Sequence, residues 1–217
     1  MAEKPKLPEA VLKFFKETGA QGGKARAERH SKEQLAEWEK NGRPSPPPHI
    51  VKQKTIDEFR KNFNAGILVE TGTYFGDMIE AQRNNFKKIY SIELSEKLFH
   101  KAVKRFKAYP HIKILQGDSG LILNNLMPDI DKVSIFWLDG HYSGGMTAMG
   151  SKECPVPEEL ETIIKSSLNH IILIDDARLF NGTHDYPTLE QISDIINKSG
   201  KNFTLDVKND IIEIILK

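Results

Sequence analysis

From residue 66 onward, short apolar runs alternate with amphipathic segments. The runs are rich in Ile, Val and Leu and predict buried strands, whereas the segments between them repeat apolar residues at helical spacing. The predicted strands are Gly66–Thr71, Lys88–Leu94, Ile112–Gly117, Val133–Leu138, Ile171–Ile174, Phe203–Val207 and Ile211–Leu216. The predicted helices between them are Gly76–Asn85, Ser95–Ala108, Ser119–Leu126, Glu158–Ser167 and Thr188–Ser199. This order predicts an α/β fold with a doubly wound, mostly parallel, seven-stranded sheet. Only Asn209-Asp210 separates the last two strands, which predicts an antiparallel hairpin.

The first fifty residues differ from the rest and predict a helical or flexible appendage. Residues 1–54 contain 12 Lys and Arg against 7 Asp and Glu. This basic segment is either an arm for nucleic acid or an acidic partner, or a solvated tail. Pro44–Pro48 predicts a stiff linker, so we expect an appendage at 1–50 and a main domain at 51–217. Within that domain, Thr55 with Glu58 matches a capping box and predicts a short helix to about Phe63.

The overall composition excludes few functions, but it bears on the cellular compartment and on membrane association. The chain has 217 residues, a net charge of +1 and one cysteine, Cys154. One cysteine excludes an internal disulfide framework and favours a structural role in a reducing compartment. No apolar run is long enough to span a membrane, and the N-terminus does not resemble a signal peptide. We therefore expect a soluble cytoplasmic protein without a membrane partner, and a homo-oligomer is left open.

The stretch Gly66–Gly76 predicts a strand, a tight turn and a helix start, which together form the mouth of a nucleotide-type pocket. The glycines Gly72 and Gly76 are four apart, unlike the G-x-G-x-x-G pattern that holds a dinucleotide pyrophosphate. Glu70 precedes the turn and would repel phosphate but suit a cation. Glu93 follows about twenty residues on, where a ribose-hydroxyl acceptor belongs. These features favour S-adenosylmethionine over NAD, and the alternative is an ordinary turn without a ligand.

Acids follow every predicted strand of the parallel core. Besides Glu70 and Glu93, they are Asp118, which precedes Ser119, then Asp139, Asp175 and Asp176. The carboxyl ends of these strands share one edge of the sheet, where ligands bind in open α/β folds. Asp139, Asp175 and Asp176 could therefore converge on one Mg²⁺ ion, which prefers oxygen ligands. The alternative is that Asp175 and Asp176 brace the following loop, with Arg178 as their partner.

His141 follows Asp139 in the loop after the fourth strand. A histidine there could take the proton from a substrate hydroxyl as a general base, and the alternative is a loop histidine that packs on Tyr142. His184 is a weaker candidate for the base. The glycine-rich stretch Ser143–Gly150 is either a substrate lid or an ordinary long loop.

The sequence from about Thr55 to Lys217 resembles the class I S-adenosylmethionine-dependent methyltransferases. The stretch VETGTYFGDM is similar to their E-x-G-x-x-x-G motif, and IELS is similar to their acidic second motif. The Asp after strand four and the Asp pair after strand five resemble those of the metal-dependent O-methyltransferases, of the catechol and the macrolide- and aminocoumarin-sugar types. The first fifty residues have no counterpart in the small catechol enzymes.

This resemblance implies a Rossmann-like methyltransferase fold and a set of site residues. Glu70 and Gly72 would face the methionine end of the donor, Glu93 the ribose, and Asp118 with Ser119 the adenine. The cofactor-binding residues implied are Glu70, Gly72, Thr73, Tyr74, Gly76, Glu93, Asp118, Ser119 and Asp139. The catalytic residues would be His141 and Asp139, and the Mg²⁺ ligands would be Asp139, Asp175 and Asp176.

These observations predict a Mg²⁺-dependent O-methyltransferase that acts on a small hydroxylated substrate, a sugar or a phenol. Two other classes stay open. One is a nucleic-acid methyltransferase or binder that uses the basic arm, although the Asn/Asp-Pro-Pro-Tyr-type motif of amine-targeting relatives is absent. The other is a non-catalytic module that binds S-adenosylmethionine.

Overall fold

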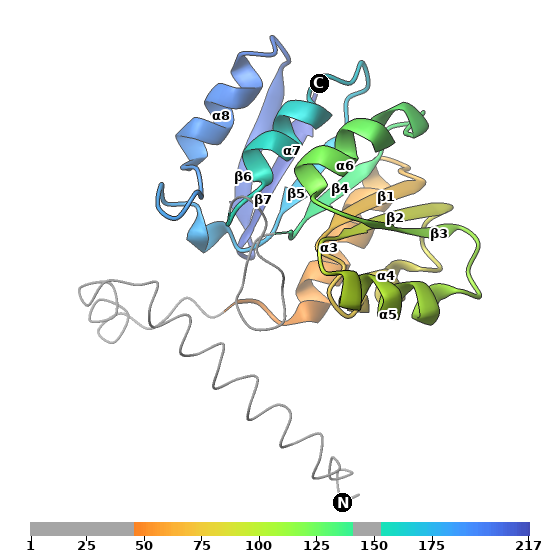
Figure 1. Ribbon diagram of the computed structural model, residues 1–217. Coiled ribbons are helices and arrows are strands. Elements are labelled where there is room, and N and C mark those ends of the chain that lie inside the picture. Colours follow the sequence, from red (N-terminus) through yellow and green to blue (C-terminus); the bar gives the residue numbers. More distant parts are fainter. Residues whose placement is uncertain (1–45, 141–152) are drawn as a thin grey trace, which may run out of the picture. The chain divides into compact units, whose positions relative to one another are not determined.

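The computed structural model describes residues 46–140 and 153–217, which build one seven-stranded sheet (Figure 1). The strands are β1 (Ile67–Thr71), β2 (Lys88–Glu93), β3 (Ile112–Gln116), β4 (Ile135–Leu138), β5 (Ile171–Ile174), β6 (Phe203–Lys208) and β7 (Ile211–Leu216). The helices are α3 (His49–Asn62), α4 (Asp77–Gln82), α5 (Glu96–Phe106), α6 (Ser119–Leu126), α7 (Val156–Ile163) and α8 (Leu189–Asn197), with 3₁₀ turns at Met127–Asp129 and Ala177–Leu179. The predicted α/β fold is confirmed.

The order of the strands across the sheet is β3-β2-β1-β4-β5-β7-β6. Strands β1 to β5 pair in parallel, whereas β7 runs antiparallel to both β5 and β6. The chain therefore starts in the middle of the sheet, winds outward to β3, returns to β4 and closes with the predicted hairpin. The order in which the chain adds strands reverses between β1 and β4, which are parallel to each other. Open α/β sheets bind ligands at such a switch point.

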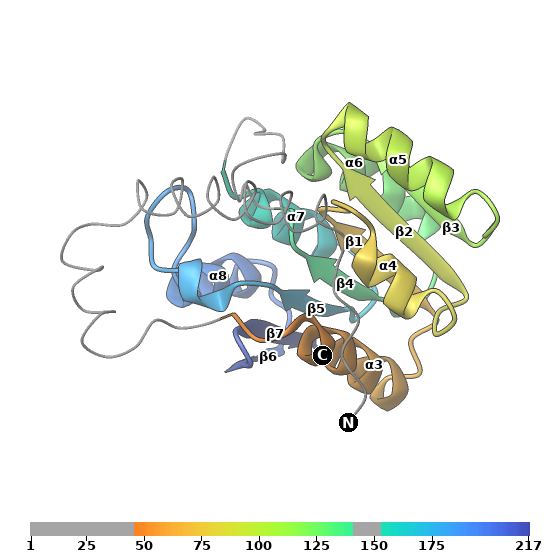
Figure 2. The same ribbon diagram turned by 90° about the horizontal axis from the view of Figure 1, so that it is seen from below.

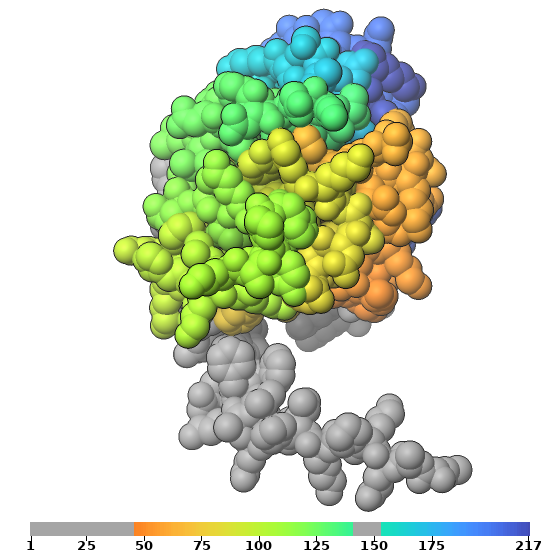
Figure 3. Space-filling view, turned by 90° about the vertical axis from the view of Figure 1, so that its right-hand side faces the viewer, coloured from red at the N-terminus to blue at the C-terminus, as the bar shows by residue number. Residues whose placement is uncertain are grey.

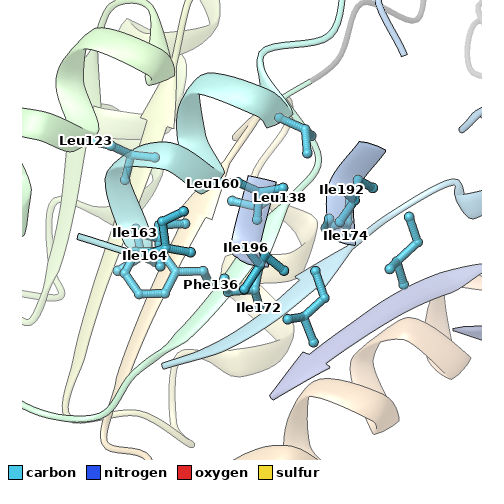
Figure 4. Packing of buried hydrophobic residues seen from close by; sticks show 14 of the residues in the cluster. Leu123, Phe136, Leu138, Leu160, Ile163, Ile164, Ile172, Ile174, Ile192 and Ile196 are labelled. Atoms are coloured by element: carbon cyan, nitrogen blue, oxygen red, sulfur yellow. The ribbon is translucent and has the colours of Figure 1, made fainter. Parts of the chain in front are cut away.

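Helices cover both faces of the sheet, as Figures 1 and 2 show. Successive residues of a strand point to opposite faces, so in β4 Phe136 and Leu138 pack with α6, α7 and α8, while Ile135 and Trp137 pack with α3, α4 and α5. Figure 4 shows the first of these layers, in which Leu160 and Ile196 lie over the strand residues. Because β4 is buried on both faces, its sequence is a continuous apolar run, as is typical of a central parallel strand.

The helix predicted to begin at Thr55 begins earlier, at His49, so the predicted capping box is wrong. Thr55 is a buried interior residue of α3, and its hydroxyl donates to the carbonyl oxygen of Val51 at 3.1 Å. The helix extends back to Pro48, whose φ of −53° and ψ of 143° suit the residue that precedes a helix. The boundary at residue 50 stays a prediction, because residues 1–45 lie outside the described parts.

Other helix ends agree with local signals. Ser95 caps α5 by accepting from the amide of Leu98, and Thr188 forms a capping box with Gln191 at the start of α8. Helix α7 begins two residues before the prediction, at Val156, because a proline is tolerated in a first turn. None of the helices within 46–140 and 153–217 is long and apolar enough to cross a membrane.

Candidate functional site

The carboxyl edge of the parallel strands brings the predicted acids into one row. Backbone hydrogen bonds continue the sheet one residue beyond the strands: Gly72 to Ile92 at 2.9 Å, Asp139 to Thr71 at 3.1 Å and Asp175 to Leu138 at 3.0 Å. Across the sheet, Glu93 therefore lies at the end of β2, Asp139 at the end of β4 and Asp175 at the end of β5. Glu70 lies in β1, between β2 and β4, one residue before the end of its strand. The sequence-based expectation that these side chains gather at one edge agrees with this geometry.

The turn after β1 needs glycine for packing. Gly72 has φ +82°, and a Cβ atom there would lie 2.3 Å from the carbonyl oxygen of Asp139. Gly76 has φ +78°, and its Cβ would lie 2.6 Å from the ring of Phe106. Both positions therefore exclude a side chain whether or not a ligand is bound. Sequence reasoning uses these glycines to predict a ligand-binding turn, whereas the neighbouring backbone and ring already require them.

Glu93 holds the turn in place. Its Oε2 accepts from the amide of Tyr74 at 2.8 Å, and its Oε1 accepts from the amide of Ser95 at 2.8 Å. Burial raises the pKa of Glu93 against these donors. Tyr74 has φ +50°, which is uncommon outside glycine, and its ring is exposed. A strained residue whose amide is pinned by a buried acid indicates a preorganised turn.

Glu70 is almost wholly buried beneath the turn. The Ser91 hydroxyl donates to Glu70 Oε2, and the Thr73 and Ser91 hydroxyls lie 2.6 Å apart. Burial, together with the charges of Asp139 and Glu93, raises the pKa of Glu70 to about 8, although the Ser91 hydrogen bond acts in the opposite direction. At neutral pH the group is therefore mostly a neutral acid, whereas the sequence suggested a carboxylate. A nearby cationic ligand would favour the charged form.

The predicted adenine residues lie after β3, at the start of α6. Asp118 is the N-cap residue of this helix, and its Oδ1 accepts from the amide of Gly120 at 2.9 Å. Ser119 is buried in the first turn. Capping accounts for the acid at this position without a ligand, so the adenine contact stays a prediction.

The pair Asp175 and Asp176 meets a cation that sequence reasoning missed. The Lys52 ammonium of α3 contacts Asp175 Oδ2, and it lies 3.7 Å from Asp176 Oδ1. Strand β5 ends at Ile174 and Asp176 turns into the left-handed region at φ +56°. Neighbouring side chains can face one cation here because the strand has already ended.

The charge of Lys52 is governed by this cluster. Burial lowers the pKa of Lys52, but the charges of Asp175, Asp176 and Asp139 outweigh it and raise this pKa above its ordinary value. Burial and the charge of Asp176 raise the pKa of Asp175, and Lys52 acts in the opposite direction. Lys52 therefore carries a full positive charge at neutral pH, which excludes it as a general base in this state.

A second cation, Arg178, also contacts the cluster. Its guanidinium lies 2.8 Å from Asp176 Oδ1 and contacts Asp210 in the β6–β7 turn. The alternative in which Arg178 partners the aspartate pair is therefore right for Asp176, while Asp175 pairs with Lys52. Among the residues at 46–140 and 153–217, no three His, Cys, Asp or Glu side chains are grouped so that they could hold a metal ion. The predicted Mg²⁺ site is not supported there.

Sequence reasoning missed Lys52 because it began the helix at Thr55, three residues after the lysine. A signal for it exists: Lys52, Ile56 and Phe59 recur at i, i+4 and i+7, which puts the lysine on the apolar face of one longer helix. A lysine on a buried face calls for an acidic partner.

The remaining candidates divide between described and undescribed residues. His141, predicted as the base, and the stretch Ser143–Gly150 lie outside the described residues, so both stay predictions. His184 has φ +54° and is exposed in a loop after β5. Cys154 is buried and its burial raises the thiol pKa to about 12, as expected of a structural cysteine.

Comparison with known proteins gives structural relatives only. No family model matches the chain. No curated protein matches it either. Several solved structures are similar to this chain. An O-methyltransferase from Bacillus cereus in complex with S-adenosylhomocysteine has a TM-score of 0.55 at 14% identity, over 86% of this chain and 90% of that one. A methyltransferase from Podospora anserina bound to S-adenosylhomocysteine has 0.54 at 16%, over 100% of both chains. An N-methyltransferase from Bradyrhizobium japonicum has 0.53 at 12%, over 83% of this chain and 91% of that one.

The fold is that of the class I S-adenosylmethionine-dependent methyltransferases. At these identities the likeness shows the fold alone, and the similar structures include both an O-methyltransferase and an N-methyltransferase. The residues at the carboxyl edge must therefore carry any statement about the ligand and the reaction of this chain.

Proposed function

We propose that this protein binds S-adenosylmethionine at the carboxyl edge of β1, β2 and β4 and transfers its methyl group to a hydroxyl oxygen of a small molecule. One observation carries the proposal. In a methyltransferase fold, the turn after β1 is held by Glu93 and lies above the buried acid Glu70. This turn lies at the point where the order of the strands in the sheet reverses. Such a preorganised acidic turn suits a donor that carries positive charge.

The charges at this edge favour a cation over a phosphate. Lys52 and Arg178 supply two positive charges against the acids Asp139, Asp175, Asp176 and Asp210. Glu70 and Glu93 add negative charge whenever they ionise. A sulfonium and an α-ammonium would be stabilised by these groups, whereas a pyrophosphate would be repelled.

Individual residues support particular contacts with the donor. Both Glu93 oxygens accept backbone N–H groups, but a carboxylate offers about four lone-pair sites, so a ribose hydroxyl can still donate to it. Glu70 would lose its proton beside the methionine ammonium. Asp139 lies close enough to influence the pKa of both Glu70 and Lys52, which places its charge between the donor turn and the aspartate pair.

The acceptor is proposed to be a hydroxylated small molecule such as a sugar or a phenol. Asp139 would orient its hydroxyl and His141 would remove the proton, so that the oxygen attacks the methyl carbon in line. Positioning of the two reactants and electrostatic stabilisation would provide most of the rate. Mg²⁺ is left out of this proposal, because the described acids face Lys52 instead.

Two measurements test the proposal. Calorimetry with S-adenosylhomocysteine should show binding, and mass spectrometry should show methyl uptake by hydroxylated sugars or phenols when S-adenosylmethionine is supplied. Asp139→Asn should reduce transfer by at least about a hundredfold, because it removes an orienting charge from the reacting oxygen. A protein that binds neither donor nor product contradicts the proposal. Binding with transfer only to RNA or DNA, or with no transfer, would replace it with one of the two other classes.

A further inference from the structure

Lys52 reaches the acidic cluster from a part of the chain that the fold holds firmly. Its helix α3 buries Thr55 and Ile56 against the sheet, and the Gln82 side-chain amide of α4 donates to the carbonyl oxygen of Gln53 at 2.9 Å. Figure 3 shows the orange surface of α3 beside the yellow segment that contains α4. The Lys52 side chain is only 14% exposed. The ammonium of Lys52 is therefore held in place by the packing of α3, unlike that of an exposed surface lysine.

The ammonium faces the same three acids that the sequence suggests as Mg²⁺ ligands. It contacts Asp175 and lies 3.7 Å from Asp176, and the charge of Asp139 acts on it as well. A Mg²⁺ ion needs carboxylate oxygens at about 2.0–2.1 Å and a near-octahedral shell. Asp175 Oδ2 cannot offer that position while the ammonium contacts it, and two cations this close would repel each other strongly.

We propose that the Lys52 ammonium is a resident cation of the cluster formed by Asp139, Asp175 and Asp176, alongside the Arg178 guanidinium at Asp176, and that it takes the place of a divalent metal ion. Lys52 is then a positioning residue. It holds Asp175 and Asp176, which follow β5, close together, and its positive charge favours the ionised form of Asp175. For catalysis this inference rests on the proposed function, because a resident ammonium would let methyl transfer proceed without added metal. For metal binding it stands independently.

The decisive measurement is a titration of the protein with Mn²⁺, a hard cation that accepts the same oxygen ligands as Mg²⁺, followed by the electron paramagnetic resonance signal of the unbound ion. The wild type should show no saturable site below millimolar Mn²⁺, in line with a site already filled by an ammonium. Lys52→Met keeps the length of the aliphatic stem but removes the charge, so it should bind Mn²⁺ at least about tenfold more tightly than the wild type.

Three further variants locate the effect. Lys54→Met removes a charge from an exposed position of the same helix and should behave as the wild type. Lys52→Arg keeps a cation at the cluster and should also bind no Mn²⁺ in this range. The double variant Lys52→Met with Asp175→Asn should lose the site that Lys52→Met gains, which would assign the site to Asp175.

The outcomes separate this inference from the proposed function. Saturable Mn²⁺ binding to the wild type that Asp175→Asn abolishes would overturn the inference, even if Lys52→Met does not fold. Equal Mn²⁺ affinities of wild type and a folded Lys52→Met would overturn it too. Methyl transfer that stops with EDTA and returns with Mg²⁺ would do the same. Failure to bind S-adenosylhomocysteine, in contrast, removes the proposed function and leaves the Mn²⁺ result intact.

Discussion

A Cβ atom on Gly72 would lie 2.3 Å from the carbonyl oxygen of Asp139, so the turn after β1 and the end of β4 pack backbone against backbone. The turn proposed to start the donor site and the acid proposed to orient the acceptor are thereby in direct backbone contact. In the proposed reaction, a displacement of either would change the distance between donor and acceptor, on which the rate of transfer depends steeply.

Gly72→Ala should therefore destabilise the protein by roughly 3 kcal/mol, the sum of left-handed backbone strain and overpacking against Asp139. Urea unfolding measures the change. Gly200→Ala is the matched control, because Gly200 also has a positive φ, +75°, but nothing lies within 4 Å of its Cβ position. It should cost only about 1 kcal/mol. Equal costs for the two variants would show that contact with Asp139 contributes nothing.

Glu70→Gln should remove a pH dependence of stability. Burial raises the pKa of Glu70 from 4.5 to about 8. Between these values the folded protein therefore holds a proton that the unfolded chain has lost. The free energy of unfolding then falls as the pH rises through this window, by up to about 1.4 kcal/mol per pH unit, and becomes level above it. Urea titrations across the window should show this slope in the wild type and a flatter one in the variant. Identical slopes would mean that Glu70 ionises normally.

Binding of S-adenosylmethionine near neutral pH should release a proton from Glu70. The positive charge of the donor favours the carboxylate, so the pKa falls and up to about one proton leaves per donor bound. Calorimetry in two buffers with different ionisation enthalpies measures the number released. Glu70→Gln should bind the donor without this release. Proton release that persists in the variant would assign it to another group.

Glu93→Gln should weaken donor binding by at least about tenfold, because an amide cannot accept from Tyr74, Ser95 and a ribose hydroxyl as a carboxylate does. Calorimetry with S-adenosylhomocysteine provides the dissociation constants. Glu96→Gln changes an exposed acid three residues further on and should leave the affinity unchanged. An unchanged affinity in Glu93→Gln would remove this residue from the donor site.

Much of this architecture could be predicted from the sequence because it follows from local burial. The apolar runs of β4 and β5 end abruptly in Asp139 and Asp175, and parallel strands bring such ends to one edge. The caps at Ser95 and Thr188 were readable for the same reason, since a capping side chain bonds within its own first turn. The start of α3 could not be predicted in this way. Thr55 and Glu58 match a capping pattern, but the buried face of a longer helix overrides it.

The sequence by itself determined the order of strands and helices, the row of acids and the turn with its two glycines, because each depends on residues a few positions apart. Only the tertiary structure decided which cation meets those acids. Lys52 and Asp175 are 123 residues apart in the chain. No local periodicity relates them; they meet because α3 packs on the sheet beside α4, so the same carboxylates that suggest a metal ion in the sequence bind an ammonium in the fold.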